Sequence, residues 1–346
     1  MKDRALFLLI FSITLLLLDK YIYSAIASVR PKWKTLRFTY IWWTCSLLLV
    51  VGMLVSTIVE LPFMLRMFIF VLFFLTAVAK IFVFPFLVID DLRRGAIWLW
   101  RKVSFNNPAP DAAITPMAPI PRSEFLLKAA TLVASVPFAS LAYGMVYGVY
   151  DYQVKRRTLY LPNLPRVFDG IKLGQISDIH SGSFYNRKAV MGGVNLLLNE
   201  KPDFIFFTGD LVNNLASEMR DYQDIFSKVR APLGVFSTLG NHDYGEYYYG
   251  KEASSAKAKN LADIKITHKN MGWDLLMNQN RRLRVDGEEI AIIGIENWGA
   301  GRFPKYGRMD LAMPGTEDAP VKLLLSHDPT HWRAQVLPLY PHIDVT

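Results

Sequence analysis

Acidic, imidazole and amide side chains recur just past short apolar runs in the second half of this chain. The blocks are Asp178-x-His180, Gly209-Asp210 and, behind the apolar residues 235–239, Gly240-Asn241-His242-Asp243. Carboxylate, imidazole and amide groups together provide the oxygen and nitrogen ligands that divalent first-row metal ions prefer. A pair of such ions promotes in-line displacement at phosphorus, so the pattern indicates metal-dependent hydrolysis of phosphate esters.

The first two blocks have ordinary alternatives when each is taken alone. Asp178 and His180 are spaced at i and i+2, which on extended backbone puts both side chains on one side to hold one ion. A cap followed by a surface histidine is the alternative, because short patterns recur by chance. Asp210 ends the very apolar run 204–208, where its two oxygens would each take one metal of a pair. The alternative for Asp210 is a cap on the next helix.

The third block is the most specific. The amide oxygen of Asn241 is a neutral ligand, which keeps the ligand charge low enough for an anionic substrate to enter. His242 is then free to meet the phosphate, and we expect Asp243 to fix the tautomer of His242 and raise its basicity. A polar turn without chemistry is the alternative, which the two earlier blocks disfavour.

The order of these blocks resembles the calcineurin-like metallophosphoesterase family. Its pattern runs D-x-H, G-D-x-x-D, G-N-H-D/E, a lone histidine after a strand, and G-H-x-H. The resemblance covers roughly residues 165–346 and implies an α/β domain built as a four-layer α/β/β/α sandwich. It implies that His327, after the apolar residues 321–325, is the lone metal-binding histidine, although a strand-end histidine bonded to backbone is a competing interpretation. Asn213 stands where the family usually has its second aspartate, which affects local hydrogen bonding more than metal binding.

The last block of the family pattern is not in the sequence. It would follow a strand beginning at residues 343–345, and the sequence stops at Thr346. We therefore expect a C-terminally truncated piece whose continuation holds two further metal-binding histidines, since ending in mid-strand leaves an edge unpaired. Residues 1–346 by themselves should bind metal weakly and turn over poorly.

The resemblance also implies a mechanism. The ligands expected for the first ion are Asp178, His180 and Asp210, and those for the second are Asp210, Asn241 and His327. A hydroxide held between the ions attacks phosphorus, and His242, supported by Asp243, stabilises or protonates the departing oxygen. Mixed oxygen and nitrogen ligands suit manganese, iron or zinc.

The first half of the chain has a different composition. The whole chain is 52% apolar with a mean hydropathy of +0.20, and nearly all of the apolar excess lies before residue 152. We therefore predict a transmembrane anchor over residues 1–152 and the metallophosphoesterase domain over residues 153–346. The segments long enough to cross a hydrocarbon core of roughly 30 Å are residues 5–29, 40–61, 67–89 and 125–150. Asp19-Lys20 interrupts the first of them.

Lysine and arginine residues predict the orientation. The net charge of +9 does not indicate nucleic-acid binding, because many basic residues cluster between the apolar segments. The segments 30–39 and 90–124 hold most of them and should face the cytoplasm, which puts the catalytic domain outside a bacterial cytoplasmic membrane. Lys155-Arg156-Arg157 argues for the opposite side. The five prolines within residues 106–122 favour an extended loop.

Short apolar runs alternate with helical spacing after residue 153, which indicates an α/β domain. The predicted strands are residues 171–177, 204–208, 234–239, 289–295 and 321–326. The blocks described above follow these strands, where ligands bind in such sheets. His268 and His331 are expected to be solvated or structural.

Three functions are compatible with the sequence. The first is a membrane-anchored phosphodiesterase or phosphatase, whose substrate is lipid-linked if the short connection to the last crossing keeps the site near the bilayer. The second is a hydrolase of a nucleotide-linked lipid A precursor, which requires a cytoplasmic domain. The third is a non-catalytic membrane protein that only binds a partner. The tyrosines at 244 and 247–249 either touch lipid headgroups or cover the edge of the sheet.

Overall fold

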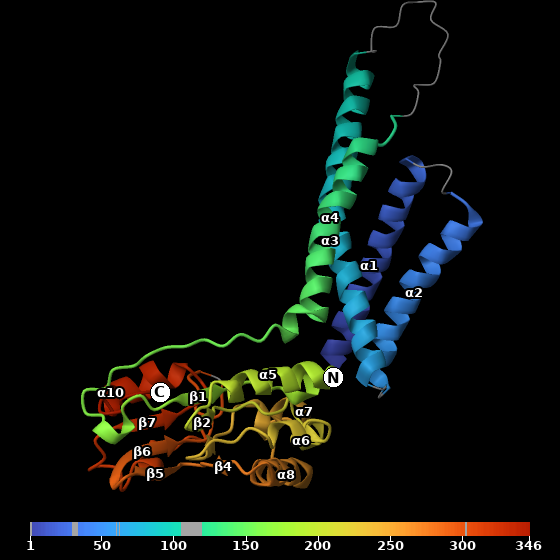
Figure 1. Ribbon diagram of the computed structural model, residues 1–346. Helices are drawn as coiled ribbons and strands as arrows, with labels where there is room; N and C mark the ends of the chain where they lie inside the picture. Colours follow the sequence, from blue (N-terminus) through green and yellow to red (C-terminus); the bar gives the residue numbers. More distant parts are fainter. Residues whose placement is uncertain (1, 30–33, 60, 62, 105–119, 302) are drawn as a thin grey trace, which may run out of the picture. The chain divides into compact units, whose positions relative to one another are not determined.

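The computed structural model describes residues 2–29, 34–59, 61, 63–104, 120–301 and 303–346 (Figure 1). The chain forms two compact units, Met1–Val149 and Tyr150–Thr346. Most of the predicted proline-rich loop at 106–122 lies outside the described residues.

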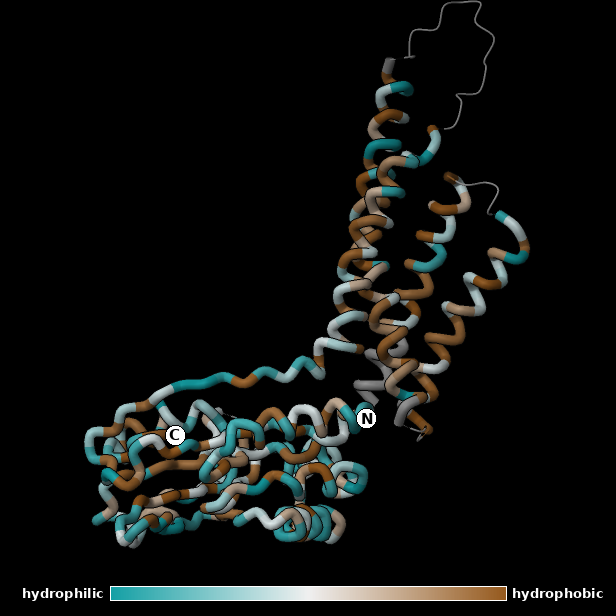
Figure 2. Tube along the Cα trace, viewed as in Figure 1, coloured by the Kyte–Doolittle hydropathy of each residue, from teal (hydrophilic) through white to brown (hydrophobic). Residues whose placement is uncertain are grey.

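The first unit consists of long apolar helices. They are α1 (Lys2–Val29), α2 (Leu36–Ile58), α3 (Phe63–Ser104) and α4 (Glu124–Val146). All four contain a stretch long and apolar enough to cross a membrane, and Figure 2 shows apolar residues along most of their length. Leu15, Val50 and Phe73 form a shared core between α1, α2 and α3. The predicted membrane region is therefore helical, as expected of a membrane protein.

Helix α3 is longer than the sequence predicts. The third crossing was expected to end at residue 89 and to lead into a basic loop, but the helix continues to Ser104. Ion pairs at i and i+3 support this extension, namely Arg93 with Asp90 at 2.9 Å and Arg94 with Asp91 at 3.1 Å. Charged residues end an apolar run without ending a helix, because such pairs stabilise helical backbone.

A buried ion pair joins α1 to α3. The carboxylate of Asp19, which is only 1% exposed, accepts a hydrogen bond from Lys80 Nζ at 2.8 Å. Lys20, which together with Asp19 interrupts the predicted first crossing, is exposed. The carboxylate is thus neutralised from another helix, as expected for a charged group among apolar helices.

The second unit contains two β-sheets. The first is parallel with strand order β1-β2-β3-β4, from β1 (Leu173–Ile176), β2 (Phe204–Phe207), β3 (Val235–Ser237) and β4 (Asp274–Leu275). The second has order β5-β6-β7, from β5 (Gln279–Val285), β6 (Glu288–Gly294) and β7 (Lys322–Leu325). Strands β5 and β6 form an antiparallel hairpin, and β7 runs parallel to β6. Val345 makes an isolated parallel bridge to Leu323, where the sequence predicts the start of a further strand.

Helices surround these sheets. They are α5 (Arg187–Asn199), α6 (Gln223–Phe226), α7 (Glu246–Tyr249), α8 (Ser255–Met271), α9 (Met309–Ala312) and α10 (Leu337–Leu339). Side-chain alternation places the layers, because successive residues of a strand point to opposite faces. Phe204 and Phe206 of β2 join the core between the sheets, whereas Ile205 and Phe207 join the core under the helices.

Strand β6 alternates in the same way. Ile290 and Ile292 face the first sheet, and Ile293 packs with Met309 of α9. The second unit is therefore layered as helices, sheet, sheet and helices, which confirms the predicted α/β/β/α architecture.

Candidate metal centre

The predicted site residues lie just past the C-terminal ends of parallel strands. Asp178 and His180 follow β1, and Asp210 follows β2. Hydrogen bonds join these two loops, from Asp178 N–H to the carbonyl of Gly209 at 2.9 Å and from His180 N–H to that of Asp210 at 3.1 Å. Residues 240–243 follow β3, and His327 follows β7 of the other sheet. The fold thus brings together blocks that are far apart in the sequence.

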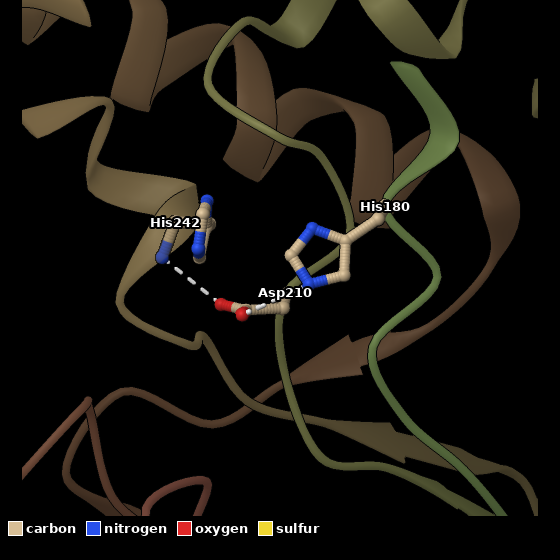
Figure 3. A group of neighbouring side chains, drawn as sticks. All are labelled: His180, Asp210 and His242. Carbon is tan, nitrogen blue, oxygen red and sulfur yellow. Dashed lines mark hydrogen bonds and ion pairs between the residues drawn. The ribbon is translucent and has the colours of Figure 1, made fainter. Parts of the chain in front are cut away.

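Asp210 lies at the centre of the site and is only 3% exposed (Figure 3). Its Oδ2 lies 3.4 Å from Nε2 of His180 and 3.4 Å from Nε2 of His327. Its Oδ1 accepts the backbone N–H of His242 at 2.9 Å. Both histidines therefore lie closest to the same oxygen, Oδ2, and the expectation that each oxygen takes one ion stays a prediction.

In three histidines of the site, the same ring nitrogen, Nδ1, faces a carbonyl oxygen. Nδ1 of His180 lies 3.0 Å from the side-chain oxygen of Asn213, and Nδ1 of His242 lies 2.7 Å from the backbone carbonyl oxygen of Asn213. Nδ1 of His327 meets the carbonyl of Thr208 at 2.9 Å. A carbonyl oxygen only accepts hydrogen bonds, so Nδ1 carries the proton and Nε2 is the nitrogen available for other chemistry.

Asn213 is a site residue whose importance the sequence argument missed. It was noted only as a departure from the family pattern, yet it orients the rings of both His180 and His242. These rings lie edge to face, with centroids 4.7 Å apart and planes at 85° (Figure 3). Its position three residues after Asp210 was the available signal, but the partners of its two oxygens depend on the folded loops.

Asp243 does not have the predicted role. Its carboxylate is fully buried and accepts hydrogen bonds at 2.8–3.3 Å from the backbone N–H groups of Asp210, Leu211, Val212 and Gly240. The ring of His242 is held by Asn213 instead. Residues 242 and 243 are neighbours on a 3₁₀ turn, where successive side chains point in different directions. Asp243 therefore locks the loop after β3 to the loop after β2, and burial together with the charge of Asp210 raises the pKa of Asp243 to about 7.

The backbone around the site is left-handed at three predicted ligands. Their φ angles are 52° at Asp178, 46° at His180 and 59° at Asp210. The extended backbone predicted at Asp178 and His180 is therefore wrong. Such conformations are costly for residues other than glycine and concentrate at functional sites, where the surrounding fold enforces them.

The possible ligand atoms form two groups that share Asp210. One group is His180, Asp210 and His242, and the other is Asp178, Asp210 and His327. Within a group the candidate atoms lie within 4.8 Å of one another. The expected assignment of Asp178 and His180 to the same ion stays a prediction, because Oδ1 of Asp178 also lies 3.9 Å from Nε2 of His180.

Two glycines allow the loops to touch. A Cβ on Gly240 would collide with the carboxylate of Asp210, and one on Gly209 would lie 2.5 Å from the backbone nitrogen of Gly240. Gly209 also has a φ of 106°. Glycine is needed at both positions because the backbones approach too closely for a side chain.

The electrostatics of the site depend on Asp210. Burial opposes its ionisation, yet hydrogen bonds from His180 and His327 hold the pKa of Asp210 well below its usual range. Burial by itself would lower the pKa of His327. The hydrogen bond to Asp210 and its negative charge outweigh burial, and the pKa of His327 is raised to about 9. The Asp210 carboxylate also raises the pKa of His180. A buried carboxylate between two imidazole nitrogens attracts cations, so the donor set fits a divalent metal ion.

Asn241 and His242 share a contact with Tyr247. Nδ2 of Asn241 donates to the Tyr247 hydroxyl at 3.1 Å. The Tyr247 ring packs on the His242 ring with centroids 4.6 Å apart. In the sequence, Tyr247 is only one of several tyrosines that follow residues 240–243.

The other two histidines considered are structural. His268 is fully buried, with Nδ1 3.0 Å from Ser237 Oγ, and burial lowers its pKa to about 3. His331 is also buried and lies between Ser326 Oγ at 3.0 Å and Gln335 Oε1 at 2.8 Å. This is one of the two roles that the sequence allows for them.

The sandwich fold thus carries a cluster of Asp and His side chains that could hold a metal ion, and comparison with known proteins identifies its family. The model of the calcineurin-like phosphoesterase family matches residues 171–343, and a model described as "Probable Calcineurin-like phosphoesterase, transmembrane domain" matches residues 3–149. The chain belongs to the calcineurin-like phosphoesterase family.

Similar proteins occur in distant organisms. A transmembrane protein with metallophosphoesterase domain from Danio rerio is 28% identical over 62% of this chain and 48% of its own length. The uncharacterized metallophosphoesterase YkuE of Bacillus subtilis is 27% identical over 56% of this chain and 66% of its own length. A UDP-2,3-diacylglucosamine pyrophosphatase of Chlamydia trachomatis is 34% identical over 25% of this chain and 27% of its own length. The chain thus spans less than two thirds of each of these relatives.

Proposed function

We propose that this protein hydrolyses a phosphate mono- or diester with two divalent metal ions bound around Asp210. The residues that would hold the ions are Asp178, His180, Asp210, Asn241 and His327. One observation carries the proposal: Oδ2 of the buried Asp210 lies 3.4 Å from two imidazole Nε2 atoms whose Nδ1 atoms face carbonyl oxygens. Imidazoles oriented in this way are typical metal ligands.

Bound ions would supply an activated hydroxide and neutralise charge on the phosphoryl oxygens. Manganese, iron or zinc fits the mixed oxygen and nitrogen donors. Because Asp210 raises the pKa of His180 and His327, protons compete with the metal for these nitrogens, and metal affinity should rise with pH.

His242 is the residue proposed to serve the leaving oxygen. Its Nδ1 donates to the carbonyl of Asn213, which leaves Nε2 to deliver a proton or a hydrogen bond to the departing group. Asp243 contributes indirectly, because it holds the loop that carries His242 against the loop that carries Asp210.

A membrane-bound phosphate ester is the proposed substrate class. The four apolar helices favour residence in a membrane, and only a short connection separates α4, which ends at Val146, from β1, which begins at Leu173. A lipid-linked substrate would reside in the same membrane as these helices. The proposed orientation, with the domain outside the cytoplasm, still rests on the positions of lysine and arginine.

A second candidate is the pyrophosphate bond of a nucleotide-linked lipid precursor. The observation in its favour is the similarity to the UDP-2,3-diacylglucosamine pyrophosphatase, which covers only 25% of this chain. This candidate needs a cytoplasmic domain. Fusion of a reporter after residue 152, active on only one side of the membrane, distinguishes the two orientations.

The proposal is tested with the full-length protein in detergent after metal removal. Manganese, iron or zinc is restored, and hydrolysis of p-nitrophenyl phosphate, bis-p-nitrophenyl phosphate and UDP-2,3-diacylglucosamine is measured. We expect activity that depends on added metal and is lost in Asp210→Asn. The matched control is Asp224→Asn, which removes an exposed carboxylate paired with Arg187. No hydrolysis with any of the metals would favour the non-catalytic binding function instead. An Asp210→Asn variant as active as its control would show that hydrolysis does not depend on a metal ion at Asp210.

A further inference from the structure

Tyr247 contacts two residues of the site from one short helix. Helix α7 begins three residues after Asp243, and Tyr247 is its second residue. The hydroxyl of Tyr247 accepts a hydrogen bond from Asn241, and its ring packs on the ring of His242. Both contacts reach residues that the proposed function uses, one for metal binding and one for proton delivery.

We propose that Tyr247 is a positioning residue, which orients the amide of Asn241 for metal binding and holds the ring of His242 for proton delivery. This inference rests on the proposed function. It adds a third role to the two that the sequence allows for this tyrosine, namely headgroup contact and cover of the sheet edge.

The amide contact selects one end of Asn241. An amide presents a donor nitrogen and an acceptor oxygen, and only the oxygen binds a cation. Nδ2 of Asn241 donates to the Tyr247 hydroxyl at 3.1 Å, so Oδ1 is the end left for the metal. Without this hydroxyl the amide can rotate by half a turn, which would present its NH₂ group to the ion.

The ring contact restricts His242. The centroids of the Tyr247 and His242 rings lie 4.6 Å apart, with an interplanar angle of 35°. The His180 and His242 rings are nearly perpendicular, with centroids 4.7 Å apart. The Nδ1 hydrogen bond to Asn213 fixes which nitrogen is free. Aromatic packing on two sides then limits rotation of the ring plane, which sets the direction of Nε2.

Helix α7 is anchored well enough to transmit this control. Its first residue, Glu246, accepts hydrogen bonds at Oε1 from Lys257 Nζ at 3.1 Å and from the Tyr306 hydroxyl at 2.7 Å. The Tyr306 ring in turn packs on the buried Tyr244 with centroids 4.3 Å apart. Tyr247 is therefore held by its helix, although 57% of its own surface is exposed.

Because Tyr247 is largely exposed, its positioning role can be tested in variants that keep the fold. Replacement of a side chain that is largely exposed removes little buried apolar surface, so the variants should fold. Tyr248 provides a matched control, because it lies on the same helix, is 58% exposed and packs on Tyr249 rather than on a site residue.

The test is metal titration of the full-length protein in detergent after chelation, with manganese binding followed by electron paramagnetic resonance. The variants are Tyr247→Phe, which keeps the ring and removes the hydroxyl, Tyr247→Leu, which removes both, and Tyr248→Phe. We expect Tyr247→Phe to weaken binding of one ion by about 10-fold, which is typical of partners that orient metal ligands, and to regain activity at saturating manganese. Tyr247→Leu should show the same loss of affinity and, in addition, a kcat that manganese does not restore.

The outcomes separate this inference from the proposed function. If the unaltered protein binds manganese and hydrolyses phosphate esters while Tyr247→Phe matches Tyr248→Phe in metal affinity, Tyr247 is not a positioning residue and the proposed function stands. If Tyr247→Leu regains full kcat at saturating manganese, the part of the inference that concerns His242 is wrong. If the unaltered protein binds none of manganese, iron and zinc, both are overturned.

Discussion

Two buried aspartates, one in each unit of the chain, have different surroundings. Asp19 lies among the apolar helices and is paired with Lys80, whereas Asp210 lies between the imidazoles of His180 and His327. A lysine ammonium has only donors and neutralises the carboxylate. An imidazole whose Nδ1 is already bonded keeps a nitrogen that can bind a metal ion. Burial of a charge therefore does not identify a functional site, but the chemistry of its partners does.

The largest expected effect concerns the two aspartates themselves. Asp210→Asn should lower kcat/KM by about 1,000-fold or more, because a bound ion stabilises the transition state by several kcal/mol. Asp19→Asn should leave kcat/KM with saturating metal unchanged. Steady-state kinetics of both variants in the same detergent measure the difference. Equal losses of activity would show that the helical unit contributes to catalysis and would remove the contrast.

Two glycines extend the comparison to the backbone. Gly240→Ala forces a methyl group against the Asp210 carboxylate, so we expect activity to fall by about 100-fold from displacement of the site. Gly144 in α4 has no atom within 4 Å of the position of an added Cβ, so Gly144→Ala should leave activity unchanged. Kinetics and circular dichroism of both variants test this prediction. A fully active Gly240→Ala variant would contradict the close approach of the two loops.

The Asp19 pair makes a prediction about stability. Lys80→Leu leaves a buried carboxylate without its partner and should destabilise the helical unit by about 3–5 kcal/mol. The double variant Asp19→Leu with Lys80→Leu should recover most of this loss, because replacement of a whole buried pair by apolar residues is often neutral. Unfolding in detergent, followed by circular dichroism, gives both values. A double variant less stable than Lys80→Leu would show that the pair contributes net stability.

The smallest expected effect concerns His268, a buried histidine whose pKa is lowered by burial alone. Burial lowers its pKa from 6.5 to about 3, so its neutral form stabilises the fold fully above pH 6.5 and this contribution is lost as the pH falls toward 3. The loss should be about 1 kcal/mol for each pH unit over that window. Melting temperatures between pH 7.5 and 4.5 should fall less steeply for His268→Leu. If the melting temperatures of the unaltered protein and of His268→Leu fell equally with pH, the lowered pKa of His268 would be contradicted.

The sequence predicted the most buried strands and missed β4 and β5. Strands β2, β3, β6 and β7 are largely buried and overlap the predicted apolar runs, because burial on both faces requires continuous apolar residues. Strand β1 also overlaps a predicted run, although Leu173 and Gln175 are exposed. Strand β5 has the sequence QNRRLRV and lies at a sheet edge, where its arginines form ion pairs with residues such as Glu289. Its pattern is too polar to stand out. Strand β4 has only two residues and lacks a pattern altogether.

The types of the site residues and their places after strands could be read from the sequence, as could the apolar helices, because both depend on residue order and local periodicity. The hydrogen-bond partners could not. Nδ1 of His327 meets the carbonyl of Thr208, 119 residues earlier, and Asp243 binds backbone groups of the loop after β2 rather than its neighbour His242. Such partners are decided by which loops the two sheets bring together, since a hydrogen bond forms only between groups that the folded chain holds within about 3 Å.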